Sequence, residues 1–490
     1  MVDPRIPDRV PNLVAGEDRF ATARGLFEKL SPATGRVICQ VARSDAEDVQ
    51  LAVSAAARAQ PAWAAATVVR RGDLLRELAL ALRQSRERVA ELVALETGKS
   101  RKDALGETDA AVEMGLFVAG EGRRFYGRTT TSAVAHKNAS TIRQPLGVAG
   151  LIIAANTPIA NVAWKVFPAL LCGNAAVLKP AEDTPLSAWA FGVLARDVGL
   201  PPGVLNIVHG HGEEAGAPLV ASAGVSVVSF TGSCEVGREI AAVAGRRLAK
   251  VCLELGGKNA LVVCDDANLE LAAEAAVLSA FSNAGQRCAA GSRIIVHEAV
   301  YARFRDLLVE RTRRLRVGCS DEDDLGPVIN EGQLRMMLEA VDRARKAGAT
   351  LLTGGARLTG PNLGGGYFMA PTLIEGARPD DPISREELFG PITCLYSVPS
   401  FAAALELAND SPYGLTASVH TRSLHRAMTF IARIQSGVAV VNGGTHGSEA
   451  HMPFGGLRQS GNGFREAGTE ALDVYSDWKT VYVNFDPEAV

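Results

Sequence analysis

The chain has 490 residues, of which 47% are hydrophobic and 21% are charged, a composition typical of folded globular proteins. This composition excludes a mostly disordered chain, and the length predicts two or three domains. The 51 Lys and Arg residues nearly balance the 54 Asp and Glu residues, giving a formal net charge of −3. Because nucleic-acid-binding proteins usually carry a basic excess, a nucleic-acid partner is disfavoured.

The eight cysteines are scattered and show no spacing suited to zinc, so we expect neither a disulfide scaffold nor a metal site. The first 20 residues are rich in charge, which disfavours a signal peptide and favours the cytoplasm. Residues 146–178 carry a single charge, Lys165, but Asn156, Thr157, Pro158 and Asn161 interrupt the apolar run. We therefore expect no membrane span and read this stretch as buried core.

The N-terminal third predicts helices. Residues 45–97 are rich in Ala, Leu, Arg and Glu, with apolar residues at three- and four-residue spacing, and residues 102–120 repeat that pattern. Pro61 is expected to separate two of these helices.

From residue 146 onward the pattern predicts strands alternating with helices. The expected strands are residues 146–155, 175–178, 205–208, 225–230 and 251–255. The expected helices are residues 158–171, 185–198, a segment starting near 214, and 235–244. Such alternation predicts an α/β fold with a doubly wound parallel sheet, whose ligands bind beyond the carboxyl ends of the strands.

Polar or small residues stand just past these strand ends: Asn156, Lys179, Gly210, Thr231-Gly232-Ser233 and Glu254. A second α/β region is expected to begin with a strand at 260–264, a helix at 269–284 and a strand at 293–297. Residues 478–483 are β-prone and predict an edge strand that can pair with another segment.

Cys288 is the cysteine placed best for chemistry, because it follows Gly285 in a turn and does not sit on an apolar strand. A thiolate is a good nucleophile for carbonyl carbons once its proton is removed. Glu254 is a lone acid among apolar strand residues, and burial would raise its pKa towards the range of a general base. The alternative for Glu254 is a salt bridge with Lys258 or another cation.

Three further motifs follow strands or fill late loops. The Asn156 amide could donate to an oxyanion or cap a helix. Lys179 and Glu182 suit ribose hydroxyls and a phosphate, or form a solvated surface pair. Phe-Thr-Gly-Ser at 230–233 offers free N–H groups at a helix start, although a tight strand–helix turn would also explain it. The loops 386–391 and 453–463 are acidic and glycine-rich, respectively.

Taken together, these motifs resemble those of the NAD(P)-dependent aldehyde dehydrogenase superfamily. The resemblance rests on Glu-Leu-Gly-Gly-Lys at 254–258, Gly-Gln-Arg-Cys at 285–288, Phe-Thr-Gly-Ser, Lys-Pro-Ala-Glu, Glu-Glu-Leu-Phe-Gly-Pro and Pro-Phe-Gly-Gly-x-x-x-Ser-Gly. It implies oxidation of a small-molecule aldehyde to a carboxylic acid with NAD as cofactor, NADP being possible.

In this resemblance Cys288 matches the nucleophile that forms a thiohemiacetal and then a thioester. Asn156 and the Cys288 backbone N–H match the oxyanion donors. Glu254 matches the base that activates the hydrolytic water, and Lys165 matches a lysine near the proton path.

The resemblance also implies the cofactor contacts. Lys179 and Glu182 match adenosine-ribose contacts, Ser233 a pyrophosphate contact, Glu387 the acid on the nicotinamide ribose, and Phe389 an aromatic beside the nicotinamide. The remaining expected contacts are Thr231, Gly232 and Leu255. Glu182 favours NAD, because a carboxylate repels a 2′-phosphate.

The expected substrate pocket departs from the common family pattern. Thr157 and Ser448 stand where aromatic residues are frequent, whereas Trp164 and Phe454 remain. We expect a roomier or more polar entrance than in enzymes for small aliphatic aldehydes. Arg287 completes the expected pocket. The sequence shows no strong arginine anchor for an acid semialdehyde, and the candidates for that role are Arg287, His446 and His451.

The resemblance further implies a Rossmann-like NAD-binding domain from residues 1–126 and 146–255 and a catalytic domain from 256–471. A small β oligomerisation arm would come from residues 127–145 and 472–490, and such arms pair in homodimers or homotetramers. Two alternatives stay open: a CoA-acylating dehydrogenase and a non-catalytic structural homologue. Glu254 argues against the first, because thiolysis needs no such base, and the intact Cys288, Glu254 and Asn156 argue against the second.

Overall fold

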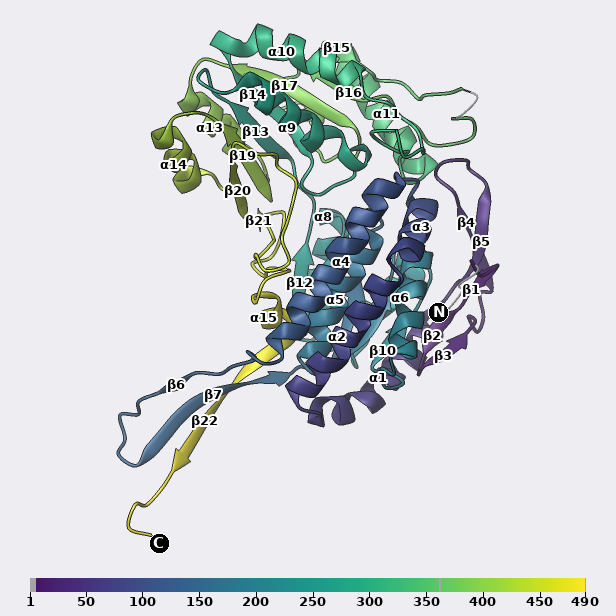
Figure 1. The fold of residues 1–490 in the computed structure, drawn as a ribbon, viewed down its shortest axis with the longest axis vertical. Coiled ribbons are helices and arrows are strands. Elements are labelled where there is room, and N and C mark those ends of the chain that lie inside the picture. The colour runs from purple at the N-terminus through teal and green to yellow at the C-terminus, as the bar shows by residue number, and fades with distance from the viewer. Residues whose placement is uncertain (1–5, 361–362, 490) are drawn as a thin grey trace.

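Two large sheets organise the molecule, and a slender arm projects from it (Figure 1). The computed structural model describes residues 6–360 and 363–489. Within those residues each large sheet has seven strands. The two sheets follow one another along the chain, because β12 (Lys250–Glu254) closes one edge of the first sheet and β13 (Asn259–Val263) lies inside the second.

The first sheet is parallel over five strands, in the order β12-β11-β8-β9-β10, and two antiparallel strands complete it. The other strands are β11 (Val227–Thr231), β8 (Val148–Ile152), β9 (Ala175–Lys179), β10 (Leu205–Ile207), β2 (Asn12–Val14) and β3 (Glu17–Arg19). The register pairs Thr231 with Glu254 and Ile152 with Lys179, so these strands end at one edge. The strand ends expected to carry ligand contacts therefore do lie together.

Helices cover both faces of this sheet, which confirms the doubly wound prediction. One face is covered by α2 (Val68–Gln84), α4 (Arg101–Glu121), α5 (Pro158–Leu171) and α6 (Pro185–Asp197). The other is covered by α1 (Ala46–Ala65), α7 (Ala217–Ala221) and α8 (Cys234–Gly245). All residues of β8 and β9 are buried, as their unbroken apolar sequences require.

The second sheet has the order β15-β16-β17-β14-β13-β19-β20 and is parallel except for β15. Its remaining strands are β15 (Thr350–Thr353), β16 (Thr372–Glu375), β17 (Ile392–Val398), β14 (Gly291–His297), β19 (Thr416–His420) and β20 (Val438–Val441). Its helices are α9 (Leu269–Phe281), α10 (Glu298–Arg313), α11 (Glu331–Lys346), α12 (Pro382–Arg385), α13 (Phe401–Asn409) and α14 (Leu424–Arg433). The cores on its two faces are separate, with α9 and α10 on one and α11, α13 and α14 on the other.

The predicted break at Pro61 is wrong. Pro61 lies inside α1, and the chain turns only at Thr67, whose side chain caps α2 by accepting a hydrogen bond from Arg70 N. The last turn of α1 is held because the buried Trp63 donates its indole N–H to the Leu170 carbonyl of α5 at 2.9 Å. Packing against a neighbouring helix thus outweighs the hydrogen bond that proline removes.

Two other helix boundaries differ from expectation. The segment near 214 is a five-residue π-helix, Gly212–Gly216, that continues into α7. The helix expected to reach residue 284 ends at Phe281, and a 3-10 turn, Ser282–Gly285, follows. The early end matters for the site, because it releases the chain before Cys288.

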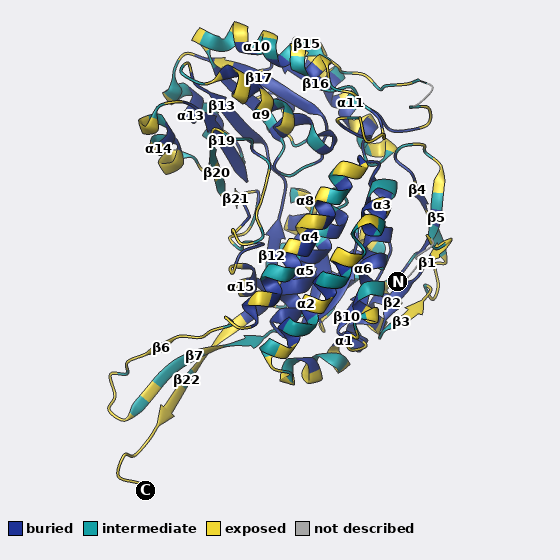
Figure 2. Ribbon diagram, in the orientation of Figure 1, coloured by how far each residue is buried: buried dark blue, intermediate teal, exposed yellow. Residues whose placement is uncertain are grey.

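The β-prone tail is a strand, as predicted. In the arm, β22 (Ser476–Asn484) pairs antiparallel with β7 (Lys137–Pro145), and β6 (Thr129–Thr130) lies beyond β7. Figure 2 shows that the arm is largely exposed, whereas the strands of both large sheets are buried. The short α15 (Ala471–Tyr475) anchors the arm by its buried face.

The smaller elements complete the fold. They are the sheet β1 (Arg9–Val10), β5 (Val37–Ala42) and β4 (Leu26–Leu30), the pair β18 (Tyr413–Gly414) and β21 (Leu457–Arg458), and α3 (Arg86–Thr97). In the part of the chain that the structure describes, every helix is too short or too polar to traverse a lipid bilayer.

Candidate active site

The turn that carries Cys288 is built by three residues in the left-handed region. Asn283 and Ala284 both have a φ of 53°, and Gly285 has a φ of 66°. A Cβ on Gly285 would lie 2.1 Å from the Gly390 carbonyl oxygen, so glycine allows the turn to touch that loop. Left-handed backbone is costly for Ala and tolerated better by Asn, and such strain is common at functional sites.

Asn259, the first residue of β13, fixes the backbone of the nucleophile. Its amide donates to the Cys288 carbonyl at 2.7 Å and to the Ala290 carbonyl at 2.9 Å. A Cβ on Gly257 would lie 2.7 Å from the same Cys288 oxygen. The Gly256-Gly257 pair therefore lets the start of the second sheet approach the thiol loop closely.

The Cys288 thiol is protonated at rest. Burial, together with the carboxylates of Glu387 and Glu254, raises its pKa to about 12, although the Ala289 N–H and Arg287 oppose the shift. A thiol with this pKa needs a base or an added positive charge to react. Both acids expected from sequence therefore act electrostatically on the thiol.

Glu254 is a buried carboxyl with only 5% exposure, and among the described residues neither of its oxygens has a hydrogen-bond partner. Burial and Glu466 raise its pKa well above the usual value, while Lys165 and Arg465 oppose the shift. Lys258 is not its partner, because the Lys258 ammonium donates to the Glu386 carbonyl at 2.7 Å. An unpartnered buried carboxyl of raised pKa has the character of a general base.

Behind Glu254 lies a buried polar cluster. Lys165 is fully buried, donates to Ser229 Oγ at 2.8 Å and forms an ion pair with Glu466, which also accepts from Ser229 Oγ at 3.0 Å. Sequence reasoning found Lys165 and missed Glu466. The signal was available, because a lone charge in an apolar stretch needs a carboxylate, but the partner lies 301 residues away.

Asn156 does not cap a helix. Glu107 instead accepts from Ile159 N at 3.0 Å at the start of α5, and the Asn156 carbonyl accepts from Lys99 at 2.8 Å and from Asn283 at 3.2 Å. Its side-chain oxygen accepts from the Asn161 amide at 3.3 Å. Among the described residues nothing accepts from the Asn156 amide nitrogen, so it is available as a donor beside the thiol turn.

The Lys179–Glu182 pair joins the last residue of β9 to the loop after it, with 2.9 Å between the charged atoms. Lys179 is buried, so the pair is not a solvated surface pair. Burial alone would raise the pKa of Glu182, but Lys179 more than offsets it and holds the pKa below its usual value. An ionised Glu182 therefore lies close to the strand ends of the first sheet.

The residues around β11 and α8 fit a pyrophosphate. Ser233 caps α8 by accepting from Val236 N, and the Thr231 hydroxyl is buried with no partner among the described residues. Gly232 packs against the Phe230 ring, where a Cβ would come within 2.4 Å. Leu255 contacts α8 at Gly237, where a Cβ would come within 2.6 Å of its side chain. An anionic ligand at the start of this helix can accept a hydrogen bond from the unpartnered Thr231 hydroxyl.

Glu387 stands at the junction of the two sheets. Its carboxylate accepts from Gly257 N at 3.1 Å, and a Cβ on Gly256 would lie 1.8 Å from it. Burial raises the pKa of Glu387 to about 7, although the Gly257 N–H and Lys258 oppose the shift. Phe389, two residues further on, has a φ of 52°, a strained conformation for an aromatic residue, as expected at a ligand contact.

Some of the expected pocket residues lie near α5, whereas others are exposed on a late loop. Trp164 and Phe454 meet edge to face with ring centroids 5.7 Å apart, forming an aromatic wall, and Thr157 opens α5 nearby. Ser448 is exposed on its loop. His451 pairs with Glu449 at 3.5 Å, on the surface, which removes it as an anchor for a substrate.

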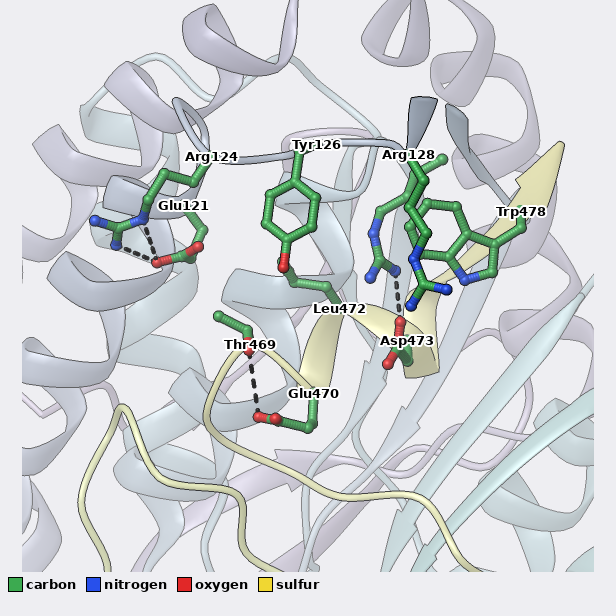
Figure 3. Close-up of a pocket in the computed structure, with 10 residues that line it drawn as sticks. Glu121, Arg124, Tyr126, Arg128, Thr469, Glu470, Leu472, Asp473 and Trp478 are labelled. Atoms are coloured by element: carbon green, nitrogen blue, oxygen red, sulfur yellow. Dashed lines mark hydrogen bonds and ion pairs between the residues drawn. The ribbon is translucent and has the colours of Figure 1, made fainter. Parts of the chain in front are cut away.

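A hollow of about 210 Å³ lies elsewhere, at the root of the arm (Figure 3). Arg124 pairs there with Glu121, and Arg143 pairs with Asp473, while Tyr126 and Trp478 stand at its sides. None of the residues expected at the site lines it. The hollow is therefore separate from the thiol.

The buried Lys165–Glu466 pair generates a stability prediction. We expect Lys165→Met to destabilise the fold by ~3–5 kcal/mol, because it leaves the Glu466 carboxylate buried without a cation. Urea unfolding checks this, with Lys102→Met on the exposed face of α4 as the control. Adding Glu466→Gln should recover most of the loss. An unchanged unfolding midpoint for Lys165→Met alone would contradict the assignment.

The comparisons with known proteins agree with this geometry. The sequence profile of the aldehyde dehydrogenase family matches residues 20–481. An alpha-ketoglutaric semialdehyde dehydrogenase of Bacillus subtilis is 38% identical over 475 residues, which cover 96% of this chain and 97% of the relative. A 2,5-dioxopentanoate dehydrogenase of Saccharolobus solfataricus is 37% identical over 450 residues, which cover 91% and 93%.

Solved structures agree as well. The structure of a betaine aldehyde dehydrogenase from Staphylococcus aureus in complex with NAD+ matches with a TM-score of 0.95 and 32% identity, covering 98% of this chain and 96% of that one. The resemblance stated from motifs, the α/β fold class and NAD as cofactor are thereby confirmed. This chain belongs to the aldehyde dehydrogenase family, and its reaction is the NAD-dependent oxidation of an aldehyde.

Proposed function

We propose that Cys288 is the nucleophile of this reaction and Glu254 its base. The main support is that the buried Glu254 carboxyl has no hydrogen-bond partner among the described residues and acts electrostatically on the Cys288 thiol, which lies on a strained turn. The thiol gives up its proton to water, and its sulfur bonds to the aldehyde carbon. The Asn156 amide and the Cys288 N–H stabilise the resulting oxyanion.

NAD, when bound, accepts the hydride that leaves the same carbon. Glu182 and Lys179 would hold the adenosine ribose, Ser233 with Thr231, Gly232 and Leu255 the pyrophosphate side, and Glu387 with Phe389 the nicotinamide end. These residues fit the group, because they offer an orphaned hydroxyl, a helix start and ionised Glu182. A carboxylate at Glu182 supports NAD over NADP.

Hydrolysis then frees the enzyme. Glu254 takes a proton from water, the hydroxide bonds to the thioester carbon, and the carbon–sulfur bond breaks to release the acid and the Cys288 thiolate. Lys165, Ser229 and Glu466 supply a buried hydrogen-bonded chain behind Glu254 that can carry the proton away.

We expect Glu254→Gln to stop at the thioester, because glutamine keeps the shape of the side chain but removes the base. Intact-mass measurement after mixing with aldehyde and NAD should show an added acyl group, with turnover lowered at least ~100-fold. Cys288→Ala should abolish the adduct, and Glu213→Gln on the surface should behave as wild type. Unchanged steady-state turnover of Glu254→Gln would remove it from this role.

We also propose an aldehyde that carries a carboxylate as the substrate. Support comes from relatives in Bacillus subtilis, Saccharolobus solfataricus and Haloferax volcanii that are named for alpha-ketoglutarate semialdehyde or 2,5-dioxopentanoate and align over more than nine-tenths of this chain. Thr157 and Ser448 in place of aromatic residues agree with a polar pocket.

A panel of aldehydes tests the substrate class. NADH formation should show a kcat/KM for 2,5-dioxopentanoate at least ~10-fold above that for pentanal, which has five carbons and no charge. Equal or higher efficiency with pentanal would contradict the acidic substrate.

We propose a division into an NAD-binding domain at 1–126 and 146–255, a catalytic domain at 256–471, and an arm at 127–145 and 472–490. This division is supported by the two separate sheets and their separate cores. We also place the enzyme in the cytoplasm. The eight cysteines, all within the described residues, are free thiols, as suits a reducing compartment.

We propose that the arm assembles the protein into a homodimer or homotetramer. β22 is the outer strand of the arm sheet, and it exposes Trp478, Tyr482, Val483 and, just beyond it, Phe485. An edge strand with apolar side chains is a surface that needs a partner. The polar hollow at its root (Figure 3) lies beside this surface.

Replacing Tyr482 and Val483 together by Asp should dissociate the assembly, because it places two charges in the apolar contact. Light scattering after size-exclusion chromatography should then give a smaller species, down to the 51.5 kDa chain. Leu248→Asp, at a residue 93% exposed on the first domain, is the control. An unchanged mass for the double variant would contradict the role of the arm.

A further inference from the structure

An arginine without an internal partner precedes the nucleophile. Arg287 is only partly exposed, its Nε is buried, and no described residue accepts a hydrogen bond from that nitrogen or forms an ion pair with the guanidinium. Many other arginines here pair with carboxylates, as Arg143 does with Asp473. A half-buried cation without a partner reduces stability unless a ligand pairs with it.

His446 is influenced by this arginine. Burial lowers the pKa of His446, and the positive charge of Arg287 lowers it further, which keeps the ring neutral. No carboxylate contributes to that shift. Glu387 and Glu254 raise the pKa of Cys288, whereas Arg287 lowers the pKa values of Cys288 and His446.

The position of His446 is fixed relative to the thiol loop. The Thr445 hydroxyl donates to the Ala289 carbonyl at 2.7 Å, which ties the loop of His446 to the residue after Cys288. The ring packs over Gly444, where a Cβ would lie 2.6 Å from ring atoms. Arg287 directly precedes Cys288, so the Cα atoms of the two residues are about 3.8 Å apart.

The hydrogen bonds around His446 indicate which ring nitrogen carries the hydrogen and can donate it. The buried Ser279 hydroxyl accepts from Thr445 N at 3.0 Å and lies 3.4 Å from His446 Nδ1. With its oxygen accepting, Ser279 can donate its hydrogen to Nδ1, which leaves the ring hydrogen on Nε2. No described residue accepts from Nε2.

We propose that Arg287 and His446 form the anchor for the distal carboxylate of the substrate. This inference rests on the proposed function, an aldehyde bearing a carboxylate. The guanidinium supplies a charge and paired N–H groups, which match a carboxylate, and His446 supplies a neutral donor. One end of the substrate is then held while the aldehyde lies at Cys288.

The proposal makes Arg287 a specificity-determining residue with a distinct signature. If Arg287 acted only by lowering the pKa of the Cys288 thiol, its loss would slow all aldehydes equally. If it holds the carboxylate, its loss should act on acidic aldehydes alone and mainly through KM.

The test compares kcat/KM for 2,5-dioxopentanoate and pentanal in four proteins: wild type, Arg287→Gln, Arg287→Lys and the control Arg303→Gln, which alters an exposed arginine of α10. Arg287→Gln should lose ~100-fold with the acid and less than ~5-fold with pentanal. Arg287→Lys should recover part of the loss, and Arg303→Gln should match wild type. Equal losses on both aldehydes, or none on the acid, would overturn the anchor.

A second readout separates the anchor from the substrate class. With pentanal as the varied substrate, glutarate should inhibit wild type competitively, and Arg287→Gln and His446→Ala should weaken that inhibition at least ~10-fold. Equal inhibition of wild type and Arg287→Gln would overturn the anchor. A wild type that prefers pentanal, yet loses glutarate inhibition with Arg287, would refute the proposed substrate and support the carboxylate site.

Discussion

The four residues that link the two sheets set the geometry on which the site depends. β12 ends at Glu254 and β13 begins at Asn259, so the chain passes from one sheet to the other within Leu255–Lys258. In that short passage Gly257 N binds Glu387, and Lys258 binds the Glu386 carbonyl. Asn259 then holds the Cys288 carbonyl. This one stretch of backbone therefore positions Glu254, the turn of Cys288 and the loop of Glu387. Its glycines have no room for side chains.

This arrangement explains why the charges of the site are left unbalanced. Glu254 and Glu387 are buried and have raised pKa values, and Arg287 has no acid partner among the described residues. Unpaired buried groups reduce stability, and proteins keep them where a ligand completes the pairing. A cationic nicotinamide would offset the acids, and an anionic aldehyde would offset Arg287.

Much of the fold followed from sequence patterns. The buried strands near 150 and 177 are apolar throughout, which marks a parallel sheet, and the strand ends carried Lys179 and Glu254 as predicted. Local pattern failed where tertiary contacts decide. Trp63 holds α1 beyond Pro61, and the left-handed turn at Asn283 ends α9 early. The role of Glu466 could not be predicted, because its partners are remote in sequence.

A crystal structure of Glu254→Gln soaked with NAD and 2,5-dioxopentanoate tests the central claim most directly. The account predicts continuous density between Cys288 Sγ and the former aldehyde carbon, with the distal carboxylate on Arg287 and the nicotinamide ribose on Glu387. A thiol that stays unmodified and turned away from the bound nicotinamide, with the aldehyde attached elsewhere, would contradict it.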